Sequence, residues 1–247
     1  MLLIVCPLVF LASFIDSIAG GGGLISLPAY YLAGLPPVLA AGTNKLSAML
    51  GTSVSAYSYA KKGCIDWKAA LWATAGAIPG SVLGAALLQI IPQETARLAV
   101  VLALPVITFF VLSKKDSLTP KRRVHEKMAL PACLMIGLVI GIYDGLIGPG
   151  TGTFLILLFI TVVGIDQMKA LGCARIVNLA SNVGALCSMA LGGHVLYPLG
   201  LCAALFAALG NLLGAKCALK GGIRLVRKLL LIVLALIFIK LLYDTFT

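Results

Sequence analysis

Four charged side chains lie inside otherwise apolar stretches of this chain, and they are the residues best suited to do chemistry. They are two acids, Asp16 and Asp144, and two bases, Lys45 and Arg175. A charge inside a membrane-spanning segment costs roughly 3 kcal/mol and usually has a function. The bases could bind an anion, or they could only neutralise the acids, Lys45 for example balancing Asp16. An acid could also carry a coupling proton, because a carboxyl group in a low-dielectric environment holds its proton more readily.

Two glycine-rich segments are expected to interrupt helices beside these acids. The first runs from Asp16 to Gly23 and the second from Asp144 to Gly152. Irregular backbone at membrane depth is tolerated only where it is buried in protein or lines a cavity. Glycine also lets successive N–H groups point at a ligand, and the helices that follow would turn their N-termini, which attract anions, toward the same place. The alternative is that the glycines only permit a tight turn and close helix packing.

Polar side chains accompany the charges, and their alternative role is hydrogen bonding between helices. No catalytic residue is expected among them. The expected substrate-binding residues are Asp16, Ser17, Gly20, Gly21, Gly22, Gly23, Asn44, Lys45, Asp144, Gly148, Gly150, Thr151, Arg175, Asn178 and Asn182.

The elements that position these residues are expected to be membrane-spanning α-helices. Of the 247 residues, 61% are hydrophobic and 11% charged, with a mean hydropathy of +1.09, whereas soluble domains are about half apolar and about a quarter charged. A soluble fold of this size could not bury so much apolar surface. The chain is therefore expected to be one membrane domain over 1–247. The expected apolar segments are 2–15, 24–34, 38–60, 69–91, 96–112, 128–142, 153–164, 170–191, 196–215 and 223–243.

The chain also resembles itself. Two short segments around each glycine break are followed by three longer ones, which predicts repeat one at 1–112, a loop at 113–127 and repeat two at 128–247. An offset of 130 pairs Lys45 with Arg175, and an offset of 128 pairs Asp16 with Asp144. Because charges are scarce, these coincidences are hard to attribute to chance. Close helix packing is predicted from the spacings Gly76-x-x-x-Gly80-x-x-x-Gly84 and Gly210-x-x-x-Gly214.

Basic residues set the expected orientation. They collect in 61–68, 114–127 and 216–228, whereas the turns near 35–37, 92–95 and 192–197 are almost uncharged. Basic loops face the cytoplasm, which is consistent only if each short pair is a hairpin that enters and leaves on one side. Three further crossings then make the repeats inverted, with both termini non-cytoplasmic. Inverted repeats with interrupted helices are typical of a secondary transporter and indicate its binding site.

Several motifs resemble the TauE/SafE family (the TSUP, or sulfite-exporter, permeases), in particular its YfcA-like branch. They are Phe14-Ile-Asp-Ser-Ile-Ala-Gly-Gly-Gly-Gly-Leu24, Gly42-Thr-Asn-Lys45, Gly141-Ile-Tyr-Asp-Gly145, Gly148-Pro-Gly150 and Asn178-Leu-Ala-Ser-Asn182. The resemblance covers essentially the whole chain. It implies transport of small sulfur-containing anions such as sulfite, thiosulfate, sulfoacetate or other organosulfonates across a bacterial inner membrane. Arg175, in place of a second lysine, departs from the family pattern.

A transporter is expected rather than an enzyme. A passive anion channel is one alternative, and an intramembrane aspartyl hydrolase using Asp16 and Asp144 is another. The hydrolase would need a Gly-x-Gly-Asp motif on a second helix, but Ser13-Phe14-Ile15 precede Asp16. No metal or cofactor is expected, since the seven cysteines form no C-x-x-C pair. The net charge of +11 is explained by membrane topology, so no nucleic-acid partner is expected.

This topology predicts opposite locations for two reporter fusions. A reporter fused after Thr247 should be non-cytoplasmic, and one inserted at Ser117 should be cytoplasmic, because the basic mid-chain loop stays on the cytoplasmic side. Paired alkaline phosphatase and fluorescent protein fusions at both positions measure this. Finding both reporters on the same side of the membrane would contradict the inverted arrangement.

Overall fold

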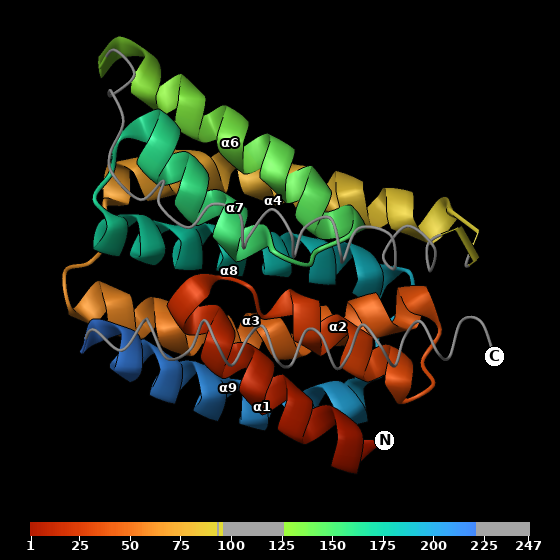
Figure 1. Ribbon diagram of the computed structural model, residues 1–247. Helices are drawn as coiled ribbons and strands as arrows, with labels where there is room; N and C mark the ends of the chain where they lie inside the picture. The colour runs from red at the N-terminus through yellow and green to blue at the C-terminus, as the bar shows by residue number, and fades with distance from the viewer. Residues whose placement is uncertain (93, 96–125, 221–247) are drawn as a thin grey trace.

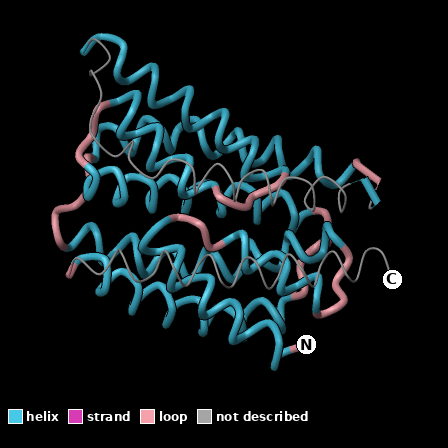
Figure 2. Tube along the Cα trace, viewed as in Figure 1, coloured by secondary structure: helices cyan, strands magenta, loops and turns pink. Residues whose placement is uncertain are grey.

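The computed structural model describes residues 1–92, 94–95 and 126–220, and every regular element in these ranges is a helix (Figures 1 and 2). The first half of the chain contains α1 (Leu2–Ala19), α2 (Gly23–Leu32), α3 (Pro37–Lys61) and α4 (Trp67–Ile90). The second half contains α6 (Glu126–Leu146), α7 (Thr151–Leu158) with a π-helical extension η1 (Phe159–Val163), α8 (Gln167–Leu191) and α9 (Tyr197–Leu219). The expected all-α fold is confirmed.

Most of the long helices can cross a membrane. In the described part of the chain, five are long and apolar enough to do so: Leu2–Ala19, Trp67–Ile90, Met128–Leu146, Gln167–Leu191 and Tyr197–Leu219. Helix α3 has the same length as α8, 25 residues, but it is more polar because Thr43, Asn44 and Lys45 lie along it. It tolerates these side chains because other helices cover it.

The helices form layers that run in the order α6, α4, α8, α3, α9 and α1 (Figure 1). Helix α4 packs between α6 and α8, and α9 packs between α1 and α3. The short helices α2 and α7 pack against α3 and α8, respectively. Each outer helix, α1 or α6, therefore packs on a helix from the other half of the chain, so the halves are interlocked.

Helices α3 and α8 lie antiparallel at the centre. Gly42, near the start of α3, packs against the carbonyl oxygen of His194, just beyond the end of α8. Gly172, near the start of α8, packs against the carbonyl oxygen of Cys64, just beyond the end of α3. These contacts are equivalent under the offset of 130 residues (42 to 172, 64 to 194). Such reciprocal contacts are what an inverted repeat would produce.

Glycines allow the close approach of helices from different halves. Those in the Gly76-Gly80-Gly84 spacing of α4 face backbone carbonyls of α6, and those in the Gly210-Gly214 spacing of α9 face carbonyls of α1. A Cβ at Gly84 would collide with the carbonyl oxygen of Ile142, and a Cβ at Gly214 with that of Phe14. The predicted packing role of both spacings is confirmed.

The interruptions are shorter than the sequence predicted. Helix α1 continues past Asp16 to Ala19, and α6 continues past Asp144 to Leu146, so the expectation that the acids begin the irregular segments is wrong. The helical hydrogen bonding persists there: the Gly20 N–H still donates to the Asp16 carbonyl at 2.7 Å. The chain turns only at Gly20, whose φ of 84° suits glycine. The expected segments 96–112 and 223–243, and nearly all of the loop 113–127, lie outside the described residues.

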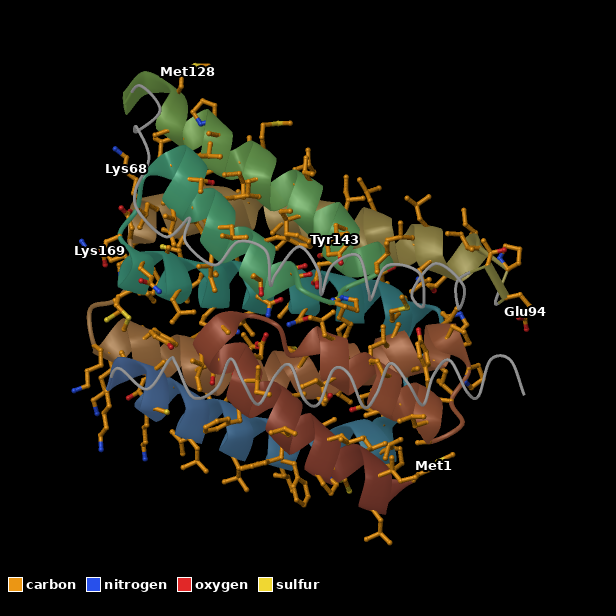
Figure 3. All side chains as sticks on the ribbon, viewed as in Figure 1. Met1, Lys68, Glu94, Met128, Tyr143 and Lys169 are labelled. Atoms are coloured by element: carbon orange, nitrogen blue, oxygen red, sulfur yellow. The ribbon has the colours of Figure 1, made fainter. Side chains whose placement is uncertain are left out.

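The two ends of the bundle differ in charge. Lys68 and Lys169 lie at one end together with Met128, whereas Met1 and Glu94 lie at the other (Figure 3). Asp66 caps α4 at the first end by accepting the Ala69 N–H at 3.1 Å. Lys68 and Lys169, near the starts of α4 and α8, therefore share one end of the molecule, opposite the N-terminus.

Filling one packing glycine should destabilise the protein. Gly84→Val is expected to lower the free energy of unfolding by at least about 1–3 kcal/mol, because the side chain has no space against α6. Thermal unfolding in detergent measures this. The matched control is Ala86→Val on an exposed face of the same helix, with an expected change within about 0.5 kcal/mol. Equal effects of the two substitutions would contradict the packing assignment.

Candidate functional site

The two helix breaks meet at the centre of the bundle. The Thr153 N–H donates to the Gly20 carbonyl at 3.0 Å, and the Thr153 hydroxyl donates to the Ala19 carbonyl at 3.0 Å. Gly20 and Gly152 touch so closely that a Cβ on either would collide with the other's backbone. The C-terminus of α1 is thereby joined to the N-terminus of α7, and irregular backbone from both halves shares one buried place.

Tyr143 contacts residues on the far side of the second break and stabilises it. Its hydroxyl donates to the Pro149 carbonyl, and its ring contacts Phe154 edge-on, with ring centroids 5.5 Å apart. The tight turn between these residues uses two left-handed glycines, Gly148 and Gly150 (φ 89° and 83°). Glycine is required at both positions because residues with a Cβ rarely adopt this conformation.

Two ion pairs join the halves beside the breaks. The Lys45 ammonium lies 2.7 Å from Asp144 Oδ2, and the Arg175 guanidinium pairs with Asp16 Oδ2. Lys45 therefore balances Asp144 of the other half, and the alternative in which it balances Asp16 of its own half is wrong. Helix α3 lies beside α8 and the second break, so the lysine reaches the acid of the other half, and Arg175 does the reverse. The exposed fractions are 5% for Lys45, 3% for Asp144 and 0% for Arg175.

Further hydrogen bonds hold both carboxylates in place. Asp144 accepts from the hydroxyls of Thr151 at 2.8 Å and Ser181 at 2.5 Å. Asp16 accepts from the Gly22 N–H at 3.1 Å. The N–H groups at the start of α2 are thus partly engaged by the Asp16 carboxylate. Lys45 also donates to Asn182 Oδ1 at 3.2 Å, so its charge is shared between two acceptors.

A cavity of about 60 Å³ lies among these groups. Its walls come from α1, α2, α3 and from the second break with α8 and α9. The expected site residues that line it are Asp16, Gly20, Gly22, Gly23, Asn44, Lys45, Asp144, Gly148, Gly150, Thr151, Asn178 and Asn182. The structure therefore gathers into one cavity most of the residues that the sequence singled out.

Three expected site residues, Ser17, Gly21 and Arg175, are not part of the cavity wall. The Ser17 hydroxyl donates to the Phe14 carbonyl of its own helix at 2.9 Å. Arg175 lies behind Asp16, packed against Gly152. Its immediate role in the structure is to hold the acid that does line the cavity.

Comparison with known proteins identifies the family. The sequence profile described as "Sulfite exporter TauE/SafE" matches residues 5–241. The chain belongs to the TauE/SafE family. Similar proteins include the probable membrane transporter protein ORF9 of Sinorhizobium sp (37% identical, covering 95% of this chain and 90% of the relative). Another is the probable membrane transporter protein YfcA of Escherichia coli K12, which is 35% identical and matches 95% of this chain and 87% of its own length. A probable membrane transporter protein of Haemophilus influenzae is 34% identical, with coverages of 95% and 92%. No solved structure matches the chain. The chain is thus a membrane transporter.

Sequence reasoning missed several polar residues of the cavity in this TauE/SafE protein. They are Ser13, Ser26 and Asn211. Asn211 follows Gly210 in a strongly apolar helix, and an isolated amide in such a helix is itself a signal. That signal was available in the sequence, but the glycine spacing around Asn211 directed the interpretation toward packing alone.

The cavity extends toward one end of the TauE/SafE fold. Leu27, Ala41 and Leu88 line it, and Leu88 belongs to the part of α4 that leads to Glu94 at the Met1 end (Figure 3). Their counterparts in the second half are Leu155, Leu171 and Ala218, under offsets of 128, 130 and 130. Both sets of residues are buried, but the counterparts do not line the cavity. Among the described residues, the cavity wall is therefore not symmetric at these three positions.

The cross-half pairing predicts a specific pattern of stability. Lys45→Gln should lower the free energy of unfolding by about 3–5 kcal/mol, because Asp144 is left buried without its cation. Adding Asp144→Asn should restore much of that loss. The matched control, Lys45→Gln with Asp16→Asn, should restore nothing, because it also strips Arg175 of its acid. Urea unfolding in detergent distinguishes the two double variants, and equal stability of the pair would contradict the cross-half assignment.

Proposed function

We propose that this protein is a secondary carrier of small sulfur-containing anions, such as sulfite, thiosulfate, sulfoacetate or other organosulfonates, and that the anion binds in the cavity at Lys45. The observation that carries the proposal is the position of the ammonium group. It lies in the cavity wall beside the Gly148 turn, where a Cβ would be 3.8 Å from Nζ. An ammonium has three protons to donate, and the described residues accept two of them, at Asp144 and Asn182.

Uncharged groups complete the proposed anion site. The amide side chains of Asn44 and Asn178 lie in the cavity wall, as do the glycines of both breaks. Amide N–H groups and backbone N–H groups bind oxyanions without adding net charge. The volume of about 60 Å³ is well above the roughly 10–15 Å³ that a single water needs, so the cavity has room for a small anion.

The charge balance of the site favours coupling to protons. Two acids and two bases form the pairs described above, so the site is neutral before the substrate binds. An anion would leave a net negative charge in a low-dielectric place, which is costly. A proton taken up by Asp144 or Asp16 removes that cost, and it also frees the paired cation to face the anion. We therefore propose that one of these acids carries a coupling proton.

The shape of the cavity favours a carrier over a channel. It includes Leu27, Ala41 and Leu88, whereas their counterparts Leu155, Leu171 and Ala218 do not line it. In a transporter built of inverted repeats, the two repeats exchange conformations and so open the site to the other side. We propose that the protein lies in the bacterial inner membrane with both termini non-cytoplasmic. Lys68 and Lys169 lie at the end opposite Met1 (Figure 3), which supports a non-cytoplasmic N-terminus.

A flux screen tests this function. The purified protein is reconstituted into proteoliposomes, and uptake of sulfite, thiosulfate, sulfoacetate and taurine is measured with and without a pH gradient. A carrier gives saturable uptake that responds to the gradient, whereas a passive channel gives uptake that rises with concentration without saturating. Absence of flux for all four compounds would reject the proposed function.

Transport by a variant in which both Lys45 and Asp144 are uncharged distinguishes an anion-binding role of Lys45 from a purely structural one. The variant Lys45→Gln/Asp144→Asn is expected to be folded, because no charge is left unpaired, but to have an at least tenfold weaker apparent affinity for the anion, in line with about 1.5–3 kcal/mol for a charged hydrogen bond. Concentration-dependent uptake in proteoliposomes measures it. Wild-type affinity in this variant would reduce Lys45 to a purely structural residue.

A further inference from the structure

Two residues of the cavity wall each have a buried acceptor atom that an anion cannot satisfy. Among the described residues, the side-chain oxygens of Asn211 and Asn44 are buried and have no hydrogen-bond donor. Both residues line the cavity. A buried acceptor without a donor is destabilising, and an anion placed beside it adds a second negative group. A ligand that reaches these oxygens would therefore satisfy them only by supplying a hydrogen-bond donor.

Asn211 is the better defined of the two. Only 2% of the residue is exposed, and its Nδ2 group donates to the Ala207 carbonyl of its own helix at 3.1 Å. Amide nitrogen and oxygen are distinguished by such partners. If the amide were reversed, two carbonyl oxygens would face each other, so Oδ1 is the atom left without a partner.

The polar groups nearby do not meet this need. Asp144 is an acceptor that is already engaged by Lys45, Thr151 and Ser181. Two of the three Lys45 protons go to Asp144 and Asn182, and the third is the one assigned above to the anion. Among the described residues that line the cavity, Lys45 is the one cation, and the oxygens of Asn211 and Asn44 stay without a donor.

We propose that the ligand of this cavity is an anion that also carries a hydrogen-bond donor, and that Asn211 recognises the donor. A monoprotonated oxyanion and a sulfonate with a hydroxyl or ammonium group share this chemistry. A fully ionised dianion with oxygen acceptors alone lacks it. The inference rests on the proposed transport function and narrows its substrates: the negative group binds at Lys45, and the donor faces Asn211 Oδ1.

An alkali cation is the competing explanation for the unpaired oxygens. A cation site needs about six oxygen ligands, whereas only two are unpaired here and both carboxylates are held by cationic side chains. The described residues also contain no group of three His, Cys, Asp or Glu side chains suited to a metal. A donor on the ligand requires fewer changes to the observed contacts.

The other half of the chain offers a matched control. The counterpart of Asn211 under the offset of 130 is Ser81. It is fully buried, donates to the Ile78 carbonyl of its own helix at 3.0 Å, and does not line the cavity. Ser81→Ala thus removes a buried polar group at the equivalent position without changing the ligand site.

The test compares two ligands that differ by one hydroxyl group. Labelled sulfite uptake into proteoliposomes is inhibited with 2-hydroxyethanesulfonate or with ethanesulfonate at one pH, in sodium-containing and sodium-free buffer. Wild-type protein and Ser81→Ala should prefer the hydroxylated inhibitor roughly tenfold. Asn211→Leu, which has a similar size but no acceptor, should lose the preference. Asn211→Ser should keep it, because a serine that donates to its own helix still has free lone pairs.

The possible outcomes are distinct. If Asn211→Leu does not fold, the wild-type preference and its retention in Asn211→Ser still decide the matter. No preference in the wild type, or a preference that survives in Asn211→Leu, overturns the inference while leaving sulfite transport intact. A requirement for sodium that shifts to higher concentration in Asn211→Leu overturns it in favour of a cation site. Absence of sulfite uptake in the wild type rejects the proposed function, and this inference with it.

Discussion

The rest of the structure depends on one constraint, which is that a charge buried at membrane depth must have a partner of opposite sign. Lys45 and Arg175 are almost fully buried, and an unpaired charge there would cost several kcal/mol. Each finds its acid on the other half of the chain. Neither half can therefore place its own cation in a satisfied position alone. The layer order, in which α1 packs on α9 and α6 on α4, is the arrangement that delivers both acids to the centre.

Backbone contacts follow the same reciprocity and show how the pairs are kept in register. The Leu196 N–H donates to the Thr43 hydroxyl at 3.0 Å, and the Asp66 N–H donates to the Cys173 sulfur at 3.3 Å. Thr43 and Cys173, like Asp66 and Leu196, are related by the 130-residue offset. Two different side chains thus perform the same task at equivalent positions. The start of each central helix is fixed to the loop that follows the other, which sets how deep Lys45 and Arg175 lie.

The sequence was sufficient to predict the all-α membrane fold and most of the cavity wall, because scarce charges and repeated glycine breaks are strong signals in an apolar chain. The partner of each cation was not predictable, since sequence proximity favours Asp16 for Lys45 whereas helix packing decides for Asp144. The extents of the breaks were overestimated for a related reason. A polar residue such as Asp16 interrupts an apolar pattern, but it does not interrupt a helix whose backbone hydrogen bonds remain intact. The role of Asn211 was missed because the neighbouring glycines explained its surroundings by packing.

The symmetric scaffold carries an asymmetric site. Equivalent positions in the two halves hold Ala48 and Asn178, Gly51 and Ser181, Thr52 and Asn182, and Ser81 and Asn211. In three of the four pairs, the residue from the second half lines the cavity with an amide, and in the remaining pair Ser181 holds Asp144. Repeated backbone and glycine contacts require equivalent small residues, so they preserve the symmetry on which the proposed exchange of conformations between the halves depends. Ligand recognition has no such requirement. A single small anion cannot make the same contacts with both halves, because the equivalent positions hold Lys45 and Arg175. The second half supplies the amides of Asn178, Asn182 and Asn211, and the first half supplies Asn44 and the charge of Lys45, so the binding site can differ between the halves while the frame around it keeps equivalent contacts.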